Sequence, residues 1–491
     1  MRNESNESIQ IRFYVCFMIN EIRGINNKEM RTKTEHTDYV KDTTATSINY
    51  GSKNLKNNST LSIVTKFISM GLSFIASPII LRCLGDEKYG VWTSLLGIVS
   101  WIYYFDLGLG GGLQNKLSTS LAQNRNDDAK KYVGTAYASL SVISFTGFVI
   151  GVILFLIIDI PGTFHYDTIG ENVTLVLTVA LFFACVNFVA KLVDNILYAT
   201  QKAGYVGMFG LVTQILWIGV LVLYLITGNS HLLWFAIAQG AVNLIKNIIE
   251  TLYIRIRFPQ FKGAFRMIEK SYAKDIMNFG ILLFINNIGS LILNTTDNLV
   301  ISRYFGAADV TPYSFCQKFF SYIQAIFVAA VTPYYAAYTA AYAQNNTEWI
   351  VRTLKKLWKV WGLFTAFSLI GIFIFKPFSE IWLQKELNYQ EGLIPLFAGY
   401  YILLMFGHTV SSFVNATYQT KKIVIPSLIS AIINIPVSIW LSVNAGMGLN
   451  GVVLGSIVSM VIAIGCTVYV VFTSLVKIKR ARDNGGEIGK L

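Results

Sequence analysis

Long apolar segments alternate with short polar connections from about residue 60 to residue 476. A helix that crosses a bilayer needs about 20 predominantly apolar residues. This rule predicts about twelve such helices, over 60–83, 91–115, 132–158, 173–200, 205–227, 231–254, 275–302, 309–342, 350–375, 393–419, 423–444 and 450–476. The pattern therefore predicts an all-α integral membrane protein, whose eighth helix is kinked at Pro312 and Pro333.

Lys and Arg gather in alternate loops, which indicates the orientation in the membrane. They lie near 125–131, 202, 255–274, 352–359, 421–422 and 477–482, whereas 158–171, 228–230 and 444–450 hold none. Arg82, Lys88, Arg303, Lys376 and Lys385 depart from this pattern. Both termini are thus predicted to be cytoplasmic. The polar composition of residues 1–59 is typical of a disordered tail, and the sequence leaves open whether Met1 or Met30 is the start.

Two sequence echoes, each about 220 residues apart, indicate a tandem repeat. LGDEKYGVW after the first helix matches FGAADVTPYSF at 305–315, and LYATQKAGYV at 197–206 matches NATYQTKKIVI at 415–425. An even number of helices in each repeat makes the repeats parallel. The predicted organisation is a tail (1–59), a six-helix lobe (60–254), a basic linker (255–274), a second six-helix lobe (275–476) and a tail (477–491), with a central cavity between the lobes.

Composition excludes several classes of protein. The chain is 54% hydrophobic and 14% charged, whereas soluble domains carry about 25% charged residues. The net charge is +13, and the basic residues lie between apolar segments rather than on one soluble face. No nucleic-acid partner is therefore expected. The five cysteines are scattered without zinc-site spacing, and no loop is long enough for a catalytic domain. We therefore expect no metal, no cofactor and no enzymatic activity.

The stretch from 84 to 115 carries the strongest functional signal. A short charged hairpin at 85–88 is predicted to precede an apolar helix that contains Asp106 and ends in the glycines Gly108, Gly110, Gly111 and Gly112. A carboxylate inside a membrane helix is costly unless it faces protein or a watery cavity. Glycine clusters permit close packing or a local break of the helix. This helix is therefore built around a polar interior, as in a transporter.

Further polar stripes follow helical spacing. They comprise Lys66, Ser69, Ser73 and Ser77; Asn187, Lys191, Asp194 and Tyr198; Asn287, Ser290, Asn294 and Asp297; Tyr313, Gln317, Ser321 and Gln324 beside Lys318; and His408, Ser412, Asn415 and Gln419. Each has a structural alternative. Ser stripes pack helices, Lys66 can snorkel, Lys191 can neutralise Asp194, and the pair Lys246 and Glu250 fits a structural role. Asp106 and Asp297 have no opposite charge at helical spacing, which favours function.

The motifs LGDEKYGVW, DLGLGGGLQNKLS and AKKYVGTAYASLS resemble the first helices of O-antigen flippases of the Wzx type. These belong to the multidrug/oligosaccharidyl-lipid/polysaccharide exporter superfamily. The close resemblance covers about residues 60–145, and beyond it rests on helix number and repeat spacing. In that superfamily helices 1, 2, 7 and 8 line most of the cavity between the lobes, which agrees with the stripes.

The resemblance implies a flippase that moves undecaprenyl-pyrophosphate-linked O-antigen repeat units across the inner membrane by alternating access, as part of lipopolysaccharide biosynthesis. Cavity residues would hold the diphosphate or the sugars, with Lys66, Lys191, Lys318, Arg303, Asn294 and Gln317 as candidates. Asp106, Asp297 and Asp194 are candidates for coupling to a proton or a sodium ion. Membrane lipid would hold the prenyl tail, and a polysaccharide polymerase complex is a further expected partner.

Three alternatives stay open. A multidrug or small-solute antiporter of the same superfamily would need fewer cations in its cavity. A non-transporting scaffold of a polysaccharide assembly complex would not need ionisable residues at several depths. A membrane polymerase or ligase usually needs a long outer loop, and the loops near 159–172 and 376–392 are short.

Overall fold

The computed structural model describes residues 52–166, 169–332, 334, 338, 341, 347–416 and 421–483; it describes side chains in these ranges except at 52–60, 278–294, 347, 415–416, 421 and 477–483. Within them the chain is helical and contains no strand. Ten helical segments of the described part are long and apolar enough to cross a membrane. The prediction of an all-α membrane protein is confirmed.

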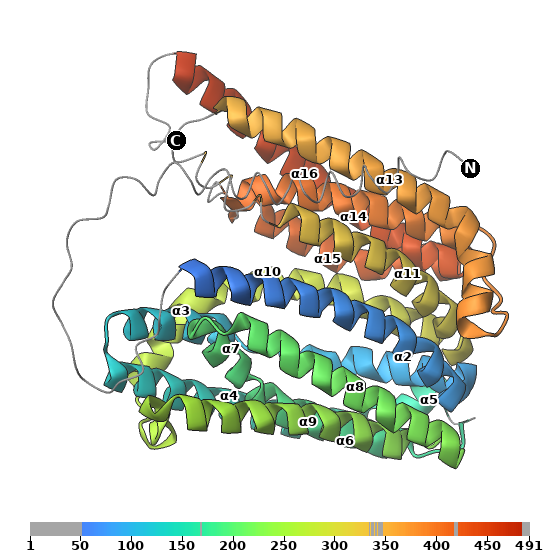
Figure 1. Ribbon diagram of the computed structural model, residues 1–491. Coiled ribbons are helices and arrows are strands. Elements are labelled where there is room, and N and C mark those ends of the chain that lie inside the picture. Colours follow the sequence, from blue (N-terminus) through green and yellow to red (C-terminus); the bar gives the residue numbers. More distant parts are fainter. Residues whose placement is uncertain are drawn as a thin grey trace, which may run out of the picture. The chain divides into compact units, whose positions relative to one another are not determined.

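Figure 1 shows the helices of the N-terminal half in blue to green and those of the C-terminal half in yellow to red. The N-terminal half contains α2 (Ser52–Ser100), η1 (Trp101–Tyr104), α3 (Leu109–Ala122), α4 (Asn126–Ile157), α5 (Ile160–Phe164), α6 (Val173–Ala190), α7 (Leu192–Ala199), α8 (Ala203–Thr227) and α9 (Leu232–Arg257). After η3 (Pro259–Phe261) and η4 (Ala264–Arg266) come α10 (Lys270–Tyr304), α11 (Ala307–Val331), α13 (Thr347–Leu383), α14 (Leu393–Ala416), α15 (Lys421–Ile439), η5 (Trp440–Asn444) and α16 (Leu449–Asp483). Pro333 lies outside the described residues.

Gly85 separates the first two predicted helices within α2. Its backbone angles (φ 73°, ψ 173°) are non-helical, and helix continues on both sides of it. Side chains with a Cβ rarely adopt this conformation, so glycine is needed here. The predicted charged hairpin at 85–88 is therefore wrong, because a single residue makes the reversal. Gly306 (φ 112°) makes the corresponding break between α10 and α11, at the place where the sequence echoes the first.

The second predicted helix is not continuous from 91 to 115. It ends at Ser100, passes through the short helix η1, and begins again as α3 at Leu109. Leu107 (φ 49°) and Gly108 (φ 74°) have left-handed backbone conformations between the two parts. The glycine tract therefore begins a new helix instead of ending a long one.

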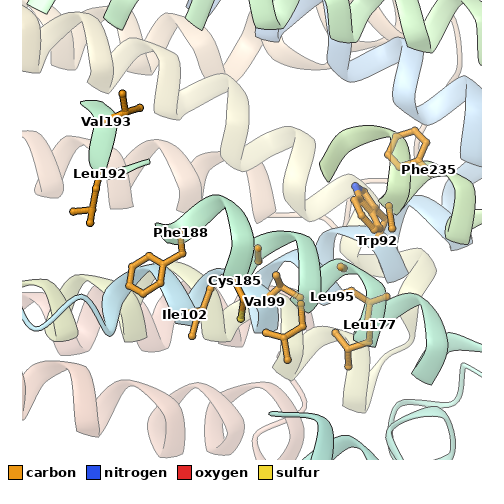
Figure 2. Packing of buried hydrophobic residues seen from close by; sticks show 14 of the residues in the cluster. Trp92, Leu95, Val99, Ile102, Leu177, Cys185, Phe188, Leu192, Val193 and Phe235 are labelled. Carbon is orange, nitrogen blue, oxygen red and sulfur yellow. The ribbon is translucent and has the colours of Figure 1, made fainter. Parts of the chain in front are cut away.

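A core of aromatic and aliphatic side chains joins the helices of the N-terminal half. Trp92 of α2 packs edge-on against Phe235 of α9, with ring centroids 5.2 Å apart, and Leu95 and Val99 continue the same face toward α6 (Figure 2). Burying large apolar side chains in this way contributes about 1.5–3 kcal/mol for each. In the C-terminal half, Phe320, Phe375 and Phe397 belong to a second core.

The predicted linker at 255–274 is docked on α4. Phe258, Phe261 and Ala264 are buried, and a Cβ on Gly134 would lie 2.1 Å from the Ala264 carbonyl oxygen. The ammonium of Lys131 pairs with the Glu269 carboxylate at 3.0 Å. This hydrogen bond holds the pKa of Glu269 below its usual value. The start of α10 is thus fastened to the N-terminal half.

Candidate functional site

A cavity of about 360 Å³ lies between α2, α8 and α9 of the N-terminal half. Its polar lining comes from Ser73, Ser77, Thr93, Thr213, Gln214, Gln239 and Asn243, and its aromatic lining from Tyr89, Trp92 and Trp217. One side chain, Lys318, reaches in from α11 of the other half. The volume is within the range of small-molecule sites, about 300–1,000 Å³.

Lys318 is held by hydroxyl groups and aromatic rings. Its Nζ donates to the Tyr89 hydroxyl at 2.7 Å and to the Ser77 hydroxyl at 3.2 Å. It also lies 5.3 Å from the Tyr89 ring centroid and 5.4 Å from that of Phe315. Among the side chains that the structure describes, no carboxylate is within ion-pair distance of it. Its positive charge is therefore available to an anion.

Two amide groups face the cavity without a described hydrogen-bond donor. The oxygens Gln214 Oε1 and Gln239 Oε1 are enclosed and accept no hydrogen bond within the described part of the chain. An enclosed polar atom without a partner costs about 1–3 kcal/mol. A ligand with hydroxyl donors would satisfy both oxygens, as would water.

A second polar cluster surrounds Asp297 of α10, which is buried. Its Oδ2 accepts a hydrogen bond from the Tyr313 hydroxyl of α11 at 2.7 Å, and the Ser456 hydroxyl of α16 is 3.3 Å away. Asn434 Nδ2 of α15 donates to Ser456 at 2.9 Å. No cation among the described side chains pairs with this carboxylate. Hydroxyl, amide and carboxylate oxygens together suit a proton or a small hard cation.

Asp106 lies in the break between η1 and α3, where it acts as a helix cap. Its Oδ1 accepts from the Gly108 amide at 2.7 Å and its Oδ2 from the Gly110 amide at 3.4 Å. The first amides of a helix have no internal partner and carry partial positive charge. Asp106 therefore has a structural explanation that sequence spacing did not provide.

Asp194 of α7 pairs with Lys246 of α9 at 2.8 Å, and Lys246 also pairs with Glu250 at 3.0 Å. The partner of Asp194 is thus a lysine 52 residues further along the chain. Lys191, which the sequence offered as its neighbour, is exposed, with its Nζ 5.9 Å from the Tyr103 ring.

The two halves meet at the glycine breaks. The Thr311 hydroxyl donates to the Asp86 carbonyl at 2.7 Å, and Lys385 pairs with the Asp86 carboxylate at 2.6 Å. A Cβ on Gly90 would lie 1.7 Å from the Ala307 carbonyl oxygen, so the two backbones are in direct contact. The end of the helices that holds Gly85 is therefore closed, and by the charge pattern it is the predicted outer end.

Comparison with known proteins assigns the family. The family model described as polysaccharide biosynthesis protein matches residues 55–339, more than half of the chain. The chain belongs to this family. A second model, MatE, matches residues 283–440. The resemblance that the sequence motifs indicated is confirmed.

Relatives and solved structures agree with this family. A Salmonella typhimurium protein named "Putative O-antigen transporter" is 25% identical over 82% of this chain and 92% of its own. The Bacillus subtilis protein "Uncharacterized membrane protein EpsK" is 22% identical over 82% of this chain and 80% of its own. An inward-facing multidrug resistance MATE family transporter of the MOP superfamily shares the fold, with a TM-score of 0.66, 17% identity and coverage of 85% and 99%. A MOP superfamily transporter from Pyrococcus furiosus has a TM-score of 0.57 and 16% identity, over 89% of this chain and 100% of its own.

In this family member the other predicted site residues whose side chains are described do not gather in one place. Lys66 is exposed on α2, and Arg303 is exposed near the end of α10, 5.9 Å from the Tyr304 ring. Gln317 is half-buried beside Lys318 but is not among the residues that line the cavity. The side chain of Asn294 lies outside the described residues. Their roles stay predictions.

Sequence reasoning missed the contribution of α8 and α9. Thr213, Gln214 and Trp217 of α8 and Gln239 and Asn243 of α9 line the cavity. The missed signal in α9 is a polar stripe, because Gln239, Asn243, Lys246 and Glu250 follow helical spacing. In α8 the signal is Gln214, because an amide in a membrane helix needs a partner.

Proposed function

We propose that the protein is a flippase that moves undecaprenyl-pyrophosphate-linked oligosaccharide repeat units of the O-antigen type across the cytoplasmic membrane. The observation that carries the proposal is Lys318, a cation without a described carboxylate partner in a polar and aromatic cavity. The name of the Salmonella typhimurium relative supports it. The delivered units would pass to a polysaccharide polymerase.

The cavity chemistry suits such a substrate. A diphosphate needs a cation when it leaves water, since burying an unpaired charge costs several kcal/mol, and Lys318 supplies one. Gln214 and Gln239 offer free amide oxygens to sugar hydroxyls, while Trp92 and Trp217 offer apolar faces to sugar rings. The prenyl chain would stay in the surrounding lipid.

Transport would proceed by alternating access, with the two halves moving against each other around the cavity. The contacts of Asp86 with Thr311 and Lys385, and the hydrogen bond from Trp382 Nε1 to the Phe74 carbonyl at 3.1 Å, support a state that is closed at the Gly85 end. The cycle would break these contacts to release the saccharide.

Asp297 is the candidate in the C-terminal half for ion coupling, with a proton or a sodium ion as its ligand. Its hydroxyl surroundings and the lack of a described cation support this role. Asp106 is the weaker candidate of the two, because its oxygens cap α3.

The second candidate function is a multidrug or small-solute antiporter, which the MatE match at 283–440 favours. A cationic drug would be repelled by Lys318, whereas an anionic saccharide carrier would be attracted. This difference in charge separates the two proposals experimentally.

The test is deletion of the gene in its own host, with surface polysaccharide and retained lipid-linked repeat units as readouts. The intact gene and the control Lys130→Ala, at a half-buried lysine paired with the exposed Asp127, should restore surface polymer. Lys318→Ala and Asp297→Asn should not, although both variants insert. Normal surface polymer in the deletion strain would overturn the flippase, and a gain in sensitivity to cationic dyes would then support the antiporter. Full activity of the Asp297→Asn variant would remove Asp297 from the mechanism.

A further inference from the structure

Three charged side chains are buried together in the N-terminal half, apart from the cavity. The Lys246 ammonium lies 2.8 Å from Asp194 and 3.0 Å from Glu250. The exposed fractions of the three side chains are 13%, 8% and 0%. Both Glu250 oxygens are enclosed and accept no well-aligned hydrogen bond from a described donor. The cluster therefore holds two carboxylates and one ammonium in a nearly dry place.

Charge balance requires one more positive charge at this cluster. Fully ionised, it carries a net negative charge, and an uncompensated buried charge costs several kcal/mol. Two carboxylates that share one site do not both stay ionised, and they bind a proton as a pair. The Asp194 and Glu250 carboxyl groups are close enough to share a hydrogen bond when one of them is protonated.

No second cation in the described surroundings takes this role. The groups that act electrostatically on Asp194 and Glu250 from neighbouring helices are the phenols of Tyr137 on α4 and Tyr198 on α7. Lys191 is directed to the Tyr103 ring. Within the described side chains, a proton is the remaining way to neutralise the cluster.

One face of α9 joins the cluster to the cavity. Gln239 and Asn243 line the cavity, and Lys246 and Glu250 follow them at spacings of three and four residues. Residues at these spacings share a helix face. The cluster and two polar groups of the cavity therefore lie along one face of the same helix.

We propose that Asp194, Lys246 and Glu250 form a proton-binding site that couples transport to the proton gradient. The step is the addition of one proton from water to the carboxylate pair, giving one carboxylic acid, and its later release to water on the other side. The site deepens the flippase proposal and rests on it for the coupling role, whereas proton binding itself needs no transported substrate.

The first experiment tests proton binding on the purified full-length protein without substrate. Infrared difference spectra between neutral and alkaline buffer exclude exposed carboxyl groups, which stay ionised in both buffers. Subtracting each variant's difference spectrum from that of the wild type also removes the contribution of Asp297. Glu250→Gln and Asp194→Asn each leave a neutral pair of one lysine and one carboxylate, so both variants should fold, and each subtraction should leave the carbonyl stretch of one protonated carboxylic acid. The subtraction for Asp127→Asn, at an exposed aspartate, should leave no such band. Subtractions that leave no carbonyl band for either cluster variant would overturn the proposal.

The second experiment tests coupling in proteoliposomes that contain the lipid-linked saccharide. An imposed pH gradient should accelerate flipping by the wild type and by Asp127→Asn, whereas Glu250→Gln should flip at the same rate with and without the gradient. A Glu250→Gln variant that responds to the gradient like the wild type would overturn the coupling role. If the wild type flips nothing, the flippase proposal and the coupling role both fail, and the infrared band alone decides whether the proton site exists.

Discussion

The Lys318 ammonium of α11 donates a hydrogen bond of 2.7 Å to the Tyr89 hydroxyl of α2, although 229 residues separate them in the chain. This bond joins the two halves of the protein at the wall of the cavity. Lys318 contributes the positive charge, whereas Tyr89 contributes a hydroxyl that accepts the hydrogen bond and a ring that contacts the ammonium.

We predict that Lys318→Gln abolishes flipping, while Tyr89→Phe reduces it only about fivefold. The phenylalanine keeps the aromatic ring beneath the ammonium and removes one hydrogen bond, which contributes about 1 kcal/mol. Initial flipping rates in proteoliposomes measure the loss of activity in each of the two variants. Equal loss in the two variants would mean that the hydroxyl, and not the charge, is required.

Substitution of Asp106 separates capping from ion coupling. Asparagine retains an oxygen that accepts from the Gly108 amide, so Asp106→Asn should keep both stability and transport. Asp106→Ala should lose the cap, at a cost of about 1 kcal/mol. Thermal unfolding in detergent and flipping rates check the two effects. An inactive but stable Asp106→Asn protein would show instead that the ionised carboxylate takes part in transport.

Gly90 permits the close contact at the Gly85 end. We expect Gly90→Ala to force the two halves apart there, because its Cβ would lie 1.7 Å from the Ala307 carbonyl oxygen. Gly71→Ala is the matched control on the same helix, since nothing lies within 4 Å of its Cβ. Cross-linking of Asp86→Cys to Lys385→Cys by a short bifunctional thiol reagent reports the closure. The yield of cross-linked protein should fall in Gly90→Ala and persist in Gly71→Ala, and an unchanged yield in both would contradict the expected separation.

The docking of the linker should depend on pH through Glu269. The hydrogen bond from Lys131 lowers the pKa of Glu269 in the folded protein. Its stabilisation is therefore fully present above the unfolded pKa and is lost as the pH falls through the lowered folded value. Proteolysis of the linker should increase on acidification in the wild type. The increase should be absent in Glu269→Gln, and an identical pH response of the two proteins would assign it to other groups.

The membrane class, the positions of most helices and the family motifs were predictable from the sequence. A bilayer requires about 20 apolar residues for each span, and this requirement is met within each segment, independently of its neighbours. The sequence did not show that Gly85 alone makes the first break, nor that a second break lies at Leu107–Gly108, because glycine permits many conformations and only the packing selects one. The sequence indicated Lys318 and Asp297 as polar positions on helix faces, yet periodicity does not say which helix a face meets.

The sequence by itself determined that this is an all-α membrane protein and which of its positions are polar within apolar helices. Only the tertiary structure decided that Lys318 enters a cavity of the other half, that Asp106 caps a helix, and that Asp194 pairs with Lys246 instead of Lys191. The physical reason is the separation in sequence between the residues that each property involves. Hydrophobic spanning is a property of each segment alone, whereas a buried charge finds its partner through helix packing between residues far apart in the chain.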